Sequence, residues 1–215
     1  MHLQRPLDFR ARYLRTLCAV STAHPAPRRA VVFGLGVGAL PRLLTALYPE
    51  LWVEVVEIDP LVIAAAESWF DLRPGPRLVV HAADATEFVR QPPPGPAFDL
   101  AVLDCFDARG VPQALTTEAF FAGALRLLAP SDVFMANVLV TRAGAGEVLV
   151  EMQQRLAEVW AVPVPRRSNI ILFGPRVGRV DVAAMRARAA ALDARVAVPF
   201  GVQAALTAAG PQPAG

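Results

Sequence analysis

Three carboxylates follow apolar, β-rich runs of the sequence, a pattern that could support chemistry at the edge of a sheet. Glu57 ends the run WVEVVE, Asp84 follows RLVVHAA, and Asp104 ends FDLAVLD. Because the carboxyl ends of neighbouring parallel strands meet at one edge, we expect these three side chains to lie together. One acid suits ribose hydroxyls, whereas three suit a nucleoside that also carries a cationic group. The implied cation is the sulfonium of S-adenosylmethionine or of decarboxylated S-adenosylmethionine.

A glycine-rich turn precedes the first of these acids. The apolar run 30–33 leads into Gly34, Gly36 and Gly38 on alternate positions, and a helical pattern follows. Such a turn lets the backbone approach a ligand closely and points unpaired helix N–H groups at it. The spacing of Gly34, Gly36 and Ala39 also fits a dinucleotide-binding fingerprint. A tight turn without a ligand and an NAD-dependent oxidoreductase therefore stay open as alternatives.

Each acid also has a structural explanation that the sequence alone leaves open. Asp59 followed by Pro60 is typical of a helix start, with Asp59 as the N-cap and Pro60 as the first helical residue. Asp84 could likewise cap the short helix that follows it, which would not prevent contact with an adenine. Glu57 and Asp104 end apolar strands, where an unpaired buried charge is costly, so a role in ligand binding is favoured for both.

The composition excludes several classes of function. The 215 residues are 54% hydrophobic and 19% charged, which fits an ordinary globular protein of one domain. No lysine is present, which excludes Schiff-base chemistry, and a net charge of +2 is too small to indicate nucleic acid. Scattered Cys18, Cys105, His2, His24 and His81 predict no metal site. No apolar run reaches the length of a membrane span, so we expect a cytoplasmic protein.

The elements that must position these residues alternate between strand and helix. Strand patterns near 30–33, 52–58, 77–82, 98–104 and 132–140 are separated by helical patterns, which predicts a parallel sheet with crossover helices. WAVPVP and NIILFGP are only three residues apart and should pair antiparallel. We therefore expect an α/β, Rossmann-like, doubly wound fold with a mostly parallel seven-stranded sheet and one antiparallel strand.

The same patterns divide the chain into three predicted segments. Residues 1–29 form a helical extension docked on the surface, 30–195 form the nucleoside-binding catalytic domain, and 196–215 form a low-complexity tail. The last ten residues, LTAAGPQPAG, are expected to fray. Trp52, Trp69 and Trp160 lie in or beside apolar runs and are expected in the core.

These residues resemble the polyamine aminopropyltransferases, of which spermidine synthase is the type, and their shorter spermidine-synthase-like relatives. The matching pieces cover roughly residues 30–174: VVFGLGVGALPRLL, VEVVEIDPLVIAAAESWF, HAADATEFV, FDLAVLDCFDARGVPQALTTEAFF and NIILFG. The resemblance implies a class I S-adenosylmethionine-dependent methyltransferase fold that lacks the family's N-terminal β-domain. It also implies a small-molecule amine as acceptor and a homodimer, without nucleic acid, membrane or metal.

The resemblance further implies a role for each site residue. Asp104 takes the catalytic position, where it accepts a proton from the attacking amine or orients it, and Asp107 helps to hold a cationic polyamine. The cofactor is bound by the glycine turn, by an acid on the ribose hydroxyls and by two residues at the adenine: Gly34, Gly36, Gly38, Glu57, Asp84 and Ala85.

The sequence departs from the family's pattern near the substrate. Val37 stands where the glycine turn usually carries an acid that meets the ammonium of the decarboxylated cofactor, and Ala108 replaces the proline that usually follows Asp107. Tyr13 and Tyr48 are the only tyrosines that could act as aromatic gatekeepers. Val37 favours intact S-adenosylmethionine. A small-molecule methyltransferase and a catalytically silent nucleoside-binding relative are therefore the alternatives to aminopropyl transfer.

Overall fold

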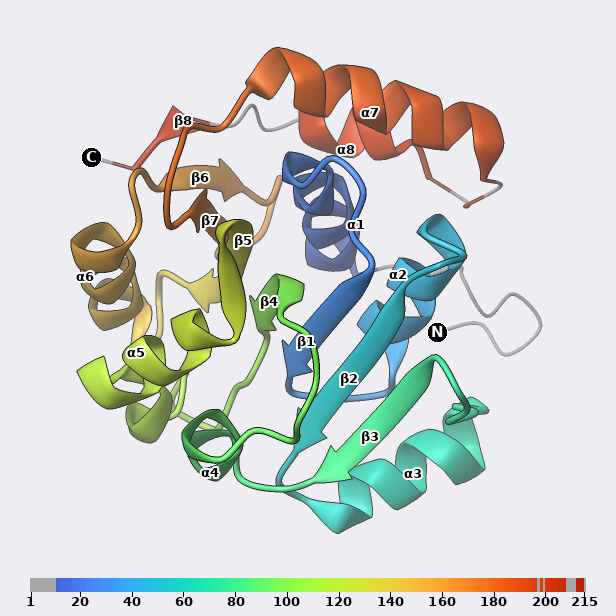
Figure 1. Ribbon diagram of the computed structural model, residues 1–215, viewed down its shortest axis with the longest axis vertical. Coiled ribbons are helices and arrows are strands. Elements are labelled where there is room, and N and C mark those ends of the chain that lie inside the picture. Colours follow the sequence, from blue (N-terminus) through green and yellow to red (C-terminus); the bar gives the residue numbers. More distant parts are fainter. Residues whose placement is uncertain (1–10, 197, 199, 208–211, 215) are drawn as a thin grey trace.

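A single mixed sheet with helices on both faces forms the structure (Figure 1). This computed structural model describes residues 11–196, 198, 200–207 and 212–214. The strand order is β3-β2-β1-β4-β5-β7-β6-β8. The strands are β1 (Arg29–Phe33), β2 (Trp52–Glu57), β3 (Leu78–Ala82), β4 (Phe98–Leu103), β5 (Leu128–Leu139), β6 (Trp160–Pro163), β7 (Asn169–Pro175) and β8 (Gln212–Pro213).

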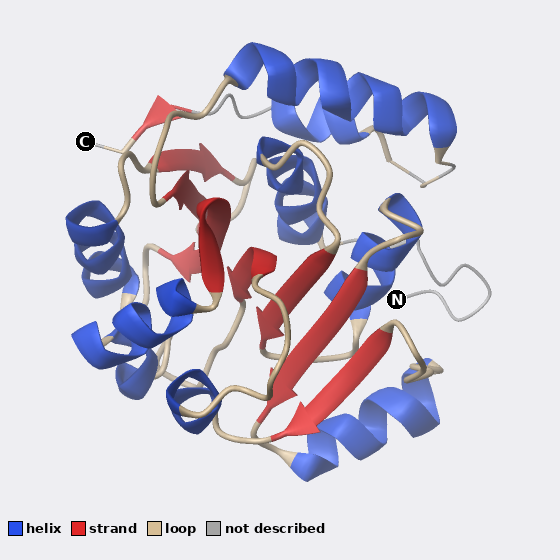
Figure 2. Ribbon diagram, viewed as in Figure 1, coloured by secondary structure: helices blue, strands red, loops and turns tan. Residues whose placement is uncertain are grey.

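Helices cover the sheet in two groups, as Figure 2 shows in blue on either side of the red strands. One face carries α1 (Arg12–Val20), α2 (Ala39–Leu47), α3 (Pro60–Phe70), α7 (Val182–Arg195) and α8 (Val202–Thr207), with η1 (Ser21–Ala23) beside α1. The other carries α4 (Ala85–Arg90), α5 (Glu118–Arg126) and α6 (Ala145–Arg155), with η2 (Gln113–Thr116) before α5. None of the described helices is long and apolar enough to cross a membrane.

The strands are apolar on both sides because each side faces a separate hydrophobic core. In β1, Ala30 and Val32 pack into the core beneath α1 and α2, whereas Val31 and Phe33 pack into the core beneath α4 and α5. All four side chains are fully buried. This two-sided burial is typical of parallel strands in doubly wound sheets and explains the near-continuous apolar runs.

The predicted fold class is confirmed, and the number of strands is corrected. Strands β3, β2, β1, β4 and β5 are parallel, and β7 is antiparallel to both β5 and β6. The prediction of seven strands is wrong because β8 pairs antiparallel with β6. Strand β8 has only two residues, in a tail rich in glycine and proline, and its sequence has no strand pattern. Its pairing with β6 follows from the position of the tail in the fold, which the sequence does not show.

Other parts of the chain are more ordered, or more exposed, than predicted. The expectation that residues 206–215 fray is wrong for Leu206, which is fully buried at the end of α8. Helix α1 is the expected helix of segment 1–29, but it contributes Leu17 and Cys18 to the core instead of lying on the surface. Residues 1–10 and 208–211 lie outside the described residues, and the division into three segments stays a prediction.

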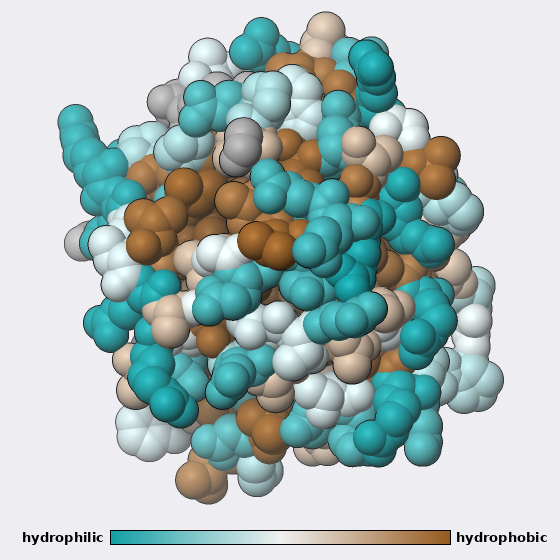
Figure 3. Space-filling view, turned by 90° about the vertical axis from the view of Figure 1, so that its left-hand side faces the viewer, coloured by the Kyte–Doolittle hydropathy of each residue, from teal (hydrophilic) through white to brown (hydrophobic). Residues whose placement is uncertain are grey.

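The tryptophans are the clearest error in burial. Trp52 is 50% exposed and Trp69 on α3 is 76% exposed, whereas Trp160 packs partly buried against the core. Helix α3 is apolar on most sides and buries only Ala66, so its sequence could not show which side faces the sheet. Figure 3, which views the α5 and α6 side of the molecule, also shows apolar residues gathered among polar ones on the surface.

Parallel pairing brings the ends of β1, β2 and β4 side by side. Phe33 pairs with Val56 on one side and with Leu103 on the other. The next residues extend the ladder, because the Gly34 N–H donates to the Val56 carbonyl and the Asp104 N–H donates to the Phe33 carbonyl, both at 2.9 Å. The glycine turn is thereby fixed against the backbone of Asp104.

Gly34 leaves no room for a side chain at this point. Its φ is +100°, and a Cβ there would lie 2.4 Å from the backbone oxygen of Asp104. Gly36 also has positive φ, at +53°, but a Cβ there would meet nothing within 4 Å. A left-handed backbone costs a non-glycine residue about 1–2 kcal/mol, and forced overpacking adds about 1–3 kcal/mol.

We therefore expect Gly34→Ala to lower the free energy of unfolding by about 2 kcal/mol more than Gly36→Ala, because only the first combines strain with a clash. Urea unfolding followed by circular dichroism measures both values. Equal losses for the two variants would show that the ends of β1 and β4 can separate without cost.

Candidate functional site

A pocket of about 530 Å³ lies at the carboxyl edge of the parallel strands. Its wall is built from the glycine turn, the ends of β2 and β4, and the first residues of α1, α3 and α4. Glu57, Asp84 and Asp104 all line it, and no arginine or histidine does among the described lining residues. The predicted meeting of three carboxylates at one sheet edge is confirmed.

Six of the eight predicted site residues line this pocket: Gly34, Gly36, Glu57, Asp84, Ala85 and Asp104. Gly38 is not among the lining residues and instead forms the N-cap of α2 with φ +72°. Asp107 is also absent from the lining and lies exposed on the loop after β4. Its Oδ1 accepts the N–H groups of Arg109 at 2.7 Å and Gly110 at 3.0 Å, which lower the pKa of the Asp107 carboxyl.

Glu57 connects the glycine turn to the end of β2. Its Oε2 accepts the N–H of Leu35 at 2.9 Å, and its Oε1 accepts the N–H of Asp59 at 3.0 Å. These two bonds fix the plane of the carboxylate at the pocket wall. Each carboxylate oxygen can accept a second hydrogen bond, so the group can still receive two hydroxyl donors.

Asp84 has a capping role and a place in the pocket at the same time. As the N-cap of α4, its Oδ1 accepts the backbone N–H and the hydroxyl of Thr86, both at 2.7 Å. Asp59 caps α3 in the same way through the N–H of Leu61 at 2.8 Å. The capping interpretations of both residues are confirmed, and the contact of Asp84 with an adenine stays a prediction.

Asp104 is held by a buried amide. The Nδ2 of Asn137 on β5 donates to Asp104 Oδ1 at 2.8 Å, and Asn137 is only 1% exposed. Burial raises the pKa of Asp104 to about 6, and the hydrogen bond from Asn137 opposes that rise. The carboxylate therefore remains mostly ionised at neutral pH and is a proton acceptor of moderate strength.

Two asparagines behind Asp104, Asn137 and Asn169, were not among the predicted site residues, whereas Tyr13 was named as a possible gatekeeper. Asn169 on β7 donates through Nδ2 to the Oδ1 of Asn137 at 2.8 Å. Tyr13 on α1 lines the pocket, and burial together with the negative charge of Asp104 raises the pKa of its phenol. An asparagine inside the apolar run DVFMANVLV was the available signal for Asn137, but the contact of Asn169 depends on tertiary packing.

Tyr48 and Cys105 have no evident chemical role. The Tyr48 hydroxyl lies 2.9 Å from the hydroxyl of Ser21, and Tyr48 is not among the lining residues of the pocket. Cys105 lines the pocket beside Asp104, but burial and the neighbouring carboxylates raise the pKa of its thiol. A neutral thiol is a poor nucleophile, so Cys105 acts as a packing residue.

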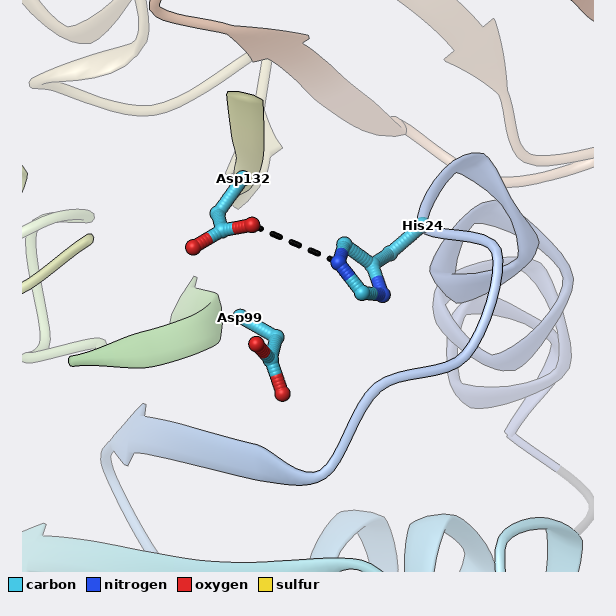
Figure 4. Close-up of side chains that lie close together, drawn as sticks. All are labelled: His24, Asp99 and Asp132. Carbon is cyan, nitrogen blue, oxygen red and sulfur yellow. Dashed lines mark ion pairs between the residues drawn. The ribbon is translucent and has the colours of Figure 1, made fainter. Parts of the chain in front are cut away.

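A second group of polar side chains lies near the amino end of the strands, away from the pocket (Figure 4). The ligand atoms of His24, Asp99 and Asp132 lie within 4.8 Å of one another, and His24 Nε2 is 3.3 Å from Asp132 Oδ1. His24 Nδ1 accepts the N–H of Ala26 at 3.3 Å, which leaves the imidazole proton on Nε2, facing Asp132. In this neutral tautomer Nε2–H donates a hydrogen bond to Asp132, whereas a metal would need that ring nitrogen unprotonated.

Comparison with known proteins gives matches of two catalytic types. The chain is 30% identical over 193 residues to the polyamine aminopropyltransferase of Vibrio vulnificus, which covers 89% of this chain and 64% of that protein. It is 26% identical over 159 residues to the eEF1A lysine and N-terminal methyltransferase of Homo sapiens, which covers 68% of this chain and 23% of that protein. The chain thus spans less than two thirds of the length of either relative.

Solved structures confirm the fold. Spermidine synthase from Thermotoga maritima superposes with a TM-score of 0.72 at 20% sequence identity, over 92% of this chain and 70% of that chain. This likeness shows the shared class I methyltransferase-like architecture. The model of the spermine/spermidine synthase domain matches residues 12–172, from the start of α1 into β7. Because this match covers most of the sequence, the chain belongs to the family of proteins with a spermine/spermidine synthase domain.

Proposed function

We propose that the pocket binds an S-adenosyl sulfonium compound and that the protein transfers a group from its sulfur to a small amine. The observation that carries this proposal is the charge of the pocket. Three carboxylates line it beside the glycine turn, without a cationic side chain among the described lining residues. Such a wall attracts a nucleoside with a positively charged sulfur and disfavours the phosphates of NAD.

Each polar group has a part in this proposal. Glu57 accepts hydrogen bonds from the two ribose hydroxyls, and Asp84 with Ala85 borders the adenine. The neutral amine attacks the carbon next to the sulfonium, a carbon–nitrogen bond forms, and the carbon–sulfur bond breaks with its electron pair going to sulfur. Asp104 orients the amine or accepts the proton that its nitrogen loses. Asp107, on the exposed loop after β4, is the proposed anchor for a distal cation of the acceptor.

Aminopropyl transfer from decarboxylated S-adenosylmethionine is the reaction suggested by the Vibrio vulnificus relative. Methyl transfer from intact S-adenosylmethionine is the second candidate, and Val37 favours it. Val37 lines the pocket and is half-buried on the glycine turn, where a side chain without charge neither attracts the ammonium of the decarboxylated cofactor nor repels a carboxylate. A cytoplasmic location and a homodimer stay predictions.

Replacing Glu57 tests the ribose assignment. We expect Glu57→Ala to weaken binding of S-adenosylmethionine and methylthioadenosine by about ten- to a hundredfold, because charge-assisted hydrogen bonds to two hydroxyls are lost. Isothermal titration calorimetry measures both affinities, with NAD as a ligand expected not to bind.

Because Glu57 also holds Leu35, a second ligand separates the two effects. The wild type should prefer methylthioadenosine over its 2′-deoxy analogue, and Glu57→Ala should lose that preference. A variant that binds weakly but still discriminates against the 2′-deoxy analogue would refute the ribose contact.

Replacing Val37 tests which cofactor is preferred. We expect the wild type to bind intact S-adenosylmethionine more tightly than the decarboxylated form, and Val37→Asp to reverse this order. The introduced carboxylate repels the cofactor's carboxylate and attracts the free ammonium, which should change the ratio of the two dissociation constants by about ten- to a hundredfold. Val37→Asn is the control, because it has nearly the same shape without the charge. If both variants keep the wild-type ratio, residue 37 does not contact the tail of the cofactor.

A further inference from the structure

We propose that Asn169 is a positioning residue that fixes the direction of the Asn137 amide, so that Asn137 always presents its N–H, and never its carbonyl oxygen, to Asp104. The catalytic value of this arrangement rests on the function proposed above for Asp104. The hydrogen-bond chain itself can be tested without any turnover.

The three side chains form one chain of hydrogen bonds across three strands or strand ends. Asn169 Nδ2 donates to Asn137 Oδ1 at 2.8 Å, and Asn137 Nδ2 donates to Asp104 Oδ1 at 2.8 Å. In the antiparallel pairing of β5 with β7, Asn137 is opposite Ile171 and Asn169 is opposite Leu139. The two asparagines are therefore diagonal neighbours on the same face of the sheet, which is how their amides meet.

The direction of the Asn137 amide matters because its two ends have opposite effects on a carboxyl group. The NH₂ end donates to a carboxylate and stabilises the ionised form, whereas the carbonyl end can only accept and stabilises the protonated form. Asn137 is 1% exposed, so water has little access to form hydrogen bonds with the amide in the opposite orientation. The donor from Asn169 occupies the carbonyl end and leaves the NH₂ end for Asp104.

Among the described residues around Asp104, no other group would hold it ionised. The titratable neighbours are Tyr13 on α1, Cys105 next in the chain, Glu57 at the end of β2 and Asp84 before α4. Tyr13 and Cys105 are neutral because burial raises the pKa of each, and the other two are acids. Burial raises the pKa of Asp104 to about 6, and the hydrogen bond from Asn137 is what opposes it.

The experiment reverses the direction of the hydrogen bonds from Asn169 through Asn137 and measures the effect on the pKa of Asp104. Carbon-13 NMR of aspartate carboxyl groups follows the titration of Asp104 in the ligand-free protein, with Asp104→Asn to assign the signal. In Asn169→Asp the introduced carboxylate can only accept at neutral pH. The Asn137 amide then turns its NH₂ toward residue 169 and its carbonyl oxygen toward Asp104, and the pKa of Asp104 rises so that it binds its proton about tenfold more tightly.

Two controls separate amide direction from simple charge. Asn169→Ser keeps a hydroxyl donor and should leave the titration of Asp104 close to that of the wild type. Asn137→Ala removes the amide, so adding Asn169→Asp in that background should produce little further change. An equal effect of Asn169→Asp with and without Asn137 would mean charge repulsion through space and would overturn the proposal, as would an unchanged titration in Asn169→Asp alone.

A kinetic measurement distinguishes this inference from the proposed function. With an amine acceptor, the rising limb of the pH–rate profile should move to higher pH in Asn169→Asp and remain in place in Asn169→Ser. If the NMR titration shifts as expected but no acceptor supports turnover in the wild type, the positioning role of Asn169 holds and the catalytic role of Asp104 fails.

Discussion

The end of β1 lies so close to the end of β4 that no side chain fits between them. A Cβ on Gly34 would lie 2.4 Å from the Asp104 carbonyl oxygen, so only glycine allows the two strand ends to keep their hydrogen bonds. This close approach has two consequences. It turns the chain toward the N-terminus of α2, and it fixes the backbone from which the Asp104 carboxylate extends. The positions of the glycine turn and of the Asp104 carboxylate in the pocket thus depend on one contact.

The electrostatics of the pocket follow from the same geometry. Parallel strands that end together bring Glu57, Asp84 and Asp104 to one wall of the pocket. Backbone N–H groups satisfy Glu57 and Asp84, whereas Asp104 receives the Asn137 side chain. Burial raises the pKa of Asp104 to about 6, which is the property required of a group that exchanges a proton near neutral pH.

The parts of the site that could be predicted from the sequence are those set by local pattern and strand direction. Glu57, Asp84 and Asp104 follow recognisable strands, and parallel pairing alone brings them together. Asn169 could not be predicted, because its place depends on the register of β5 against β7. The sequence named Tyr13 and Tyr48 as possible gatekeepers, and only the packing of α1 shows that Tyr13 is the one that lines the pocket.

The same distinction explains the errors in the fold. The pairing of β8 and the exposure of Trp69 are also consequences of tertiary arrangement, which a local pattern of apolar residues does not contain.

A pocket of this kind can serve two group transfers without a change of fold. In the proposed function the negative wall attracts a sulfonium nucleoside, and the sulfonium is common to both candidate cofactors. The cofactors differ by one carboxylate, so discrimination falls to the side chain that faces it. Gly34 is constrained by the backbone of Asp104 and Gly38 by its place at the start of α2. Val37 lies between them, half-buried at the pocket wall and packed against the core beneath α1 and α2. In the proposed function, the residue that distinguishes the two cofactors is therefore held in the fold by side-chain packing and not by backbone geometry.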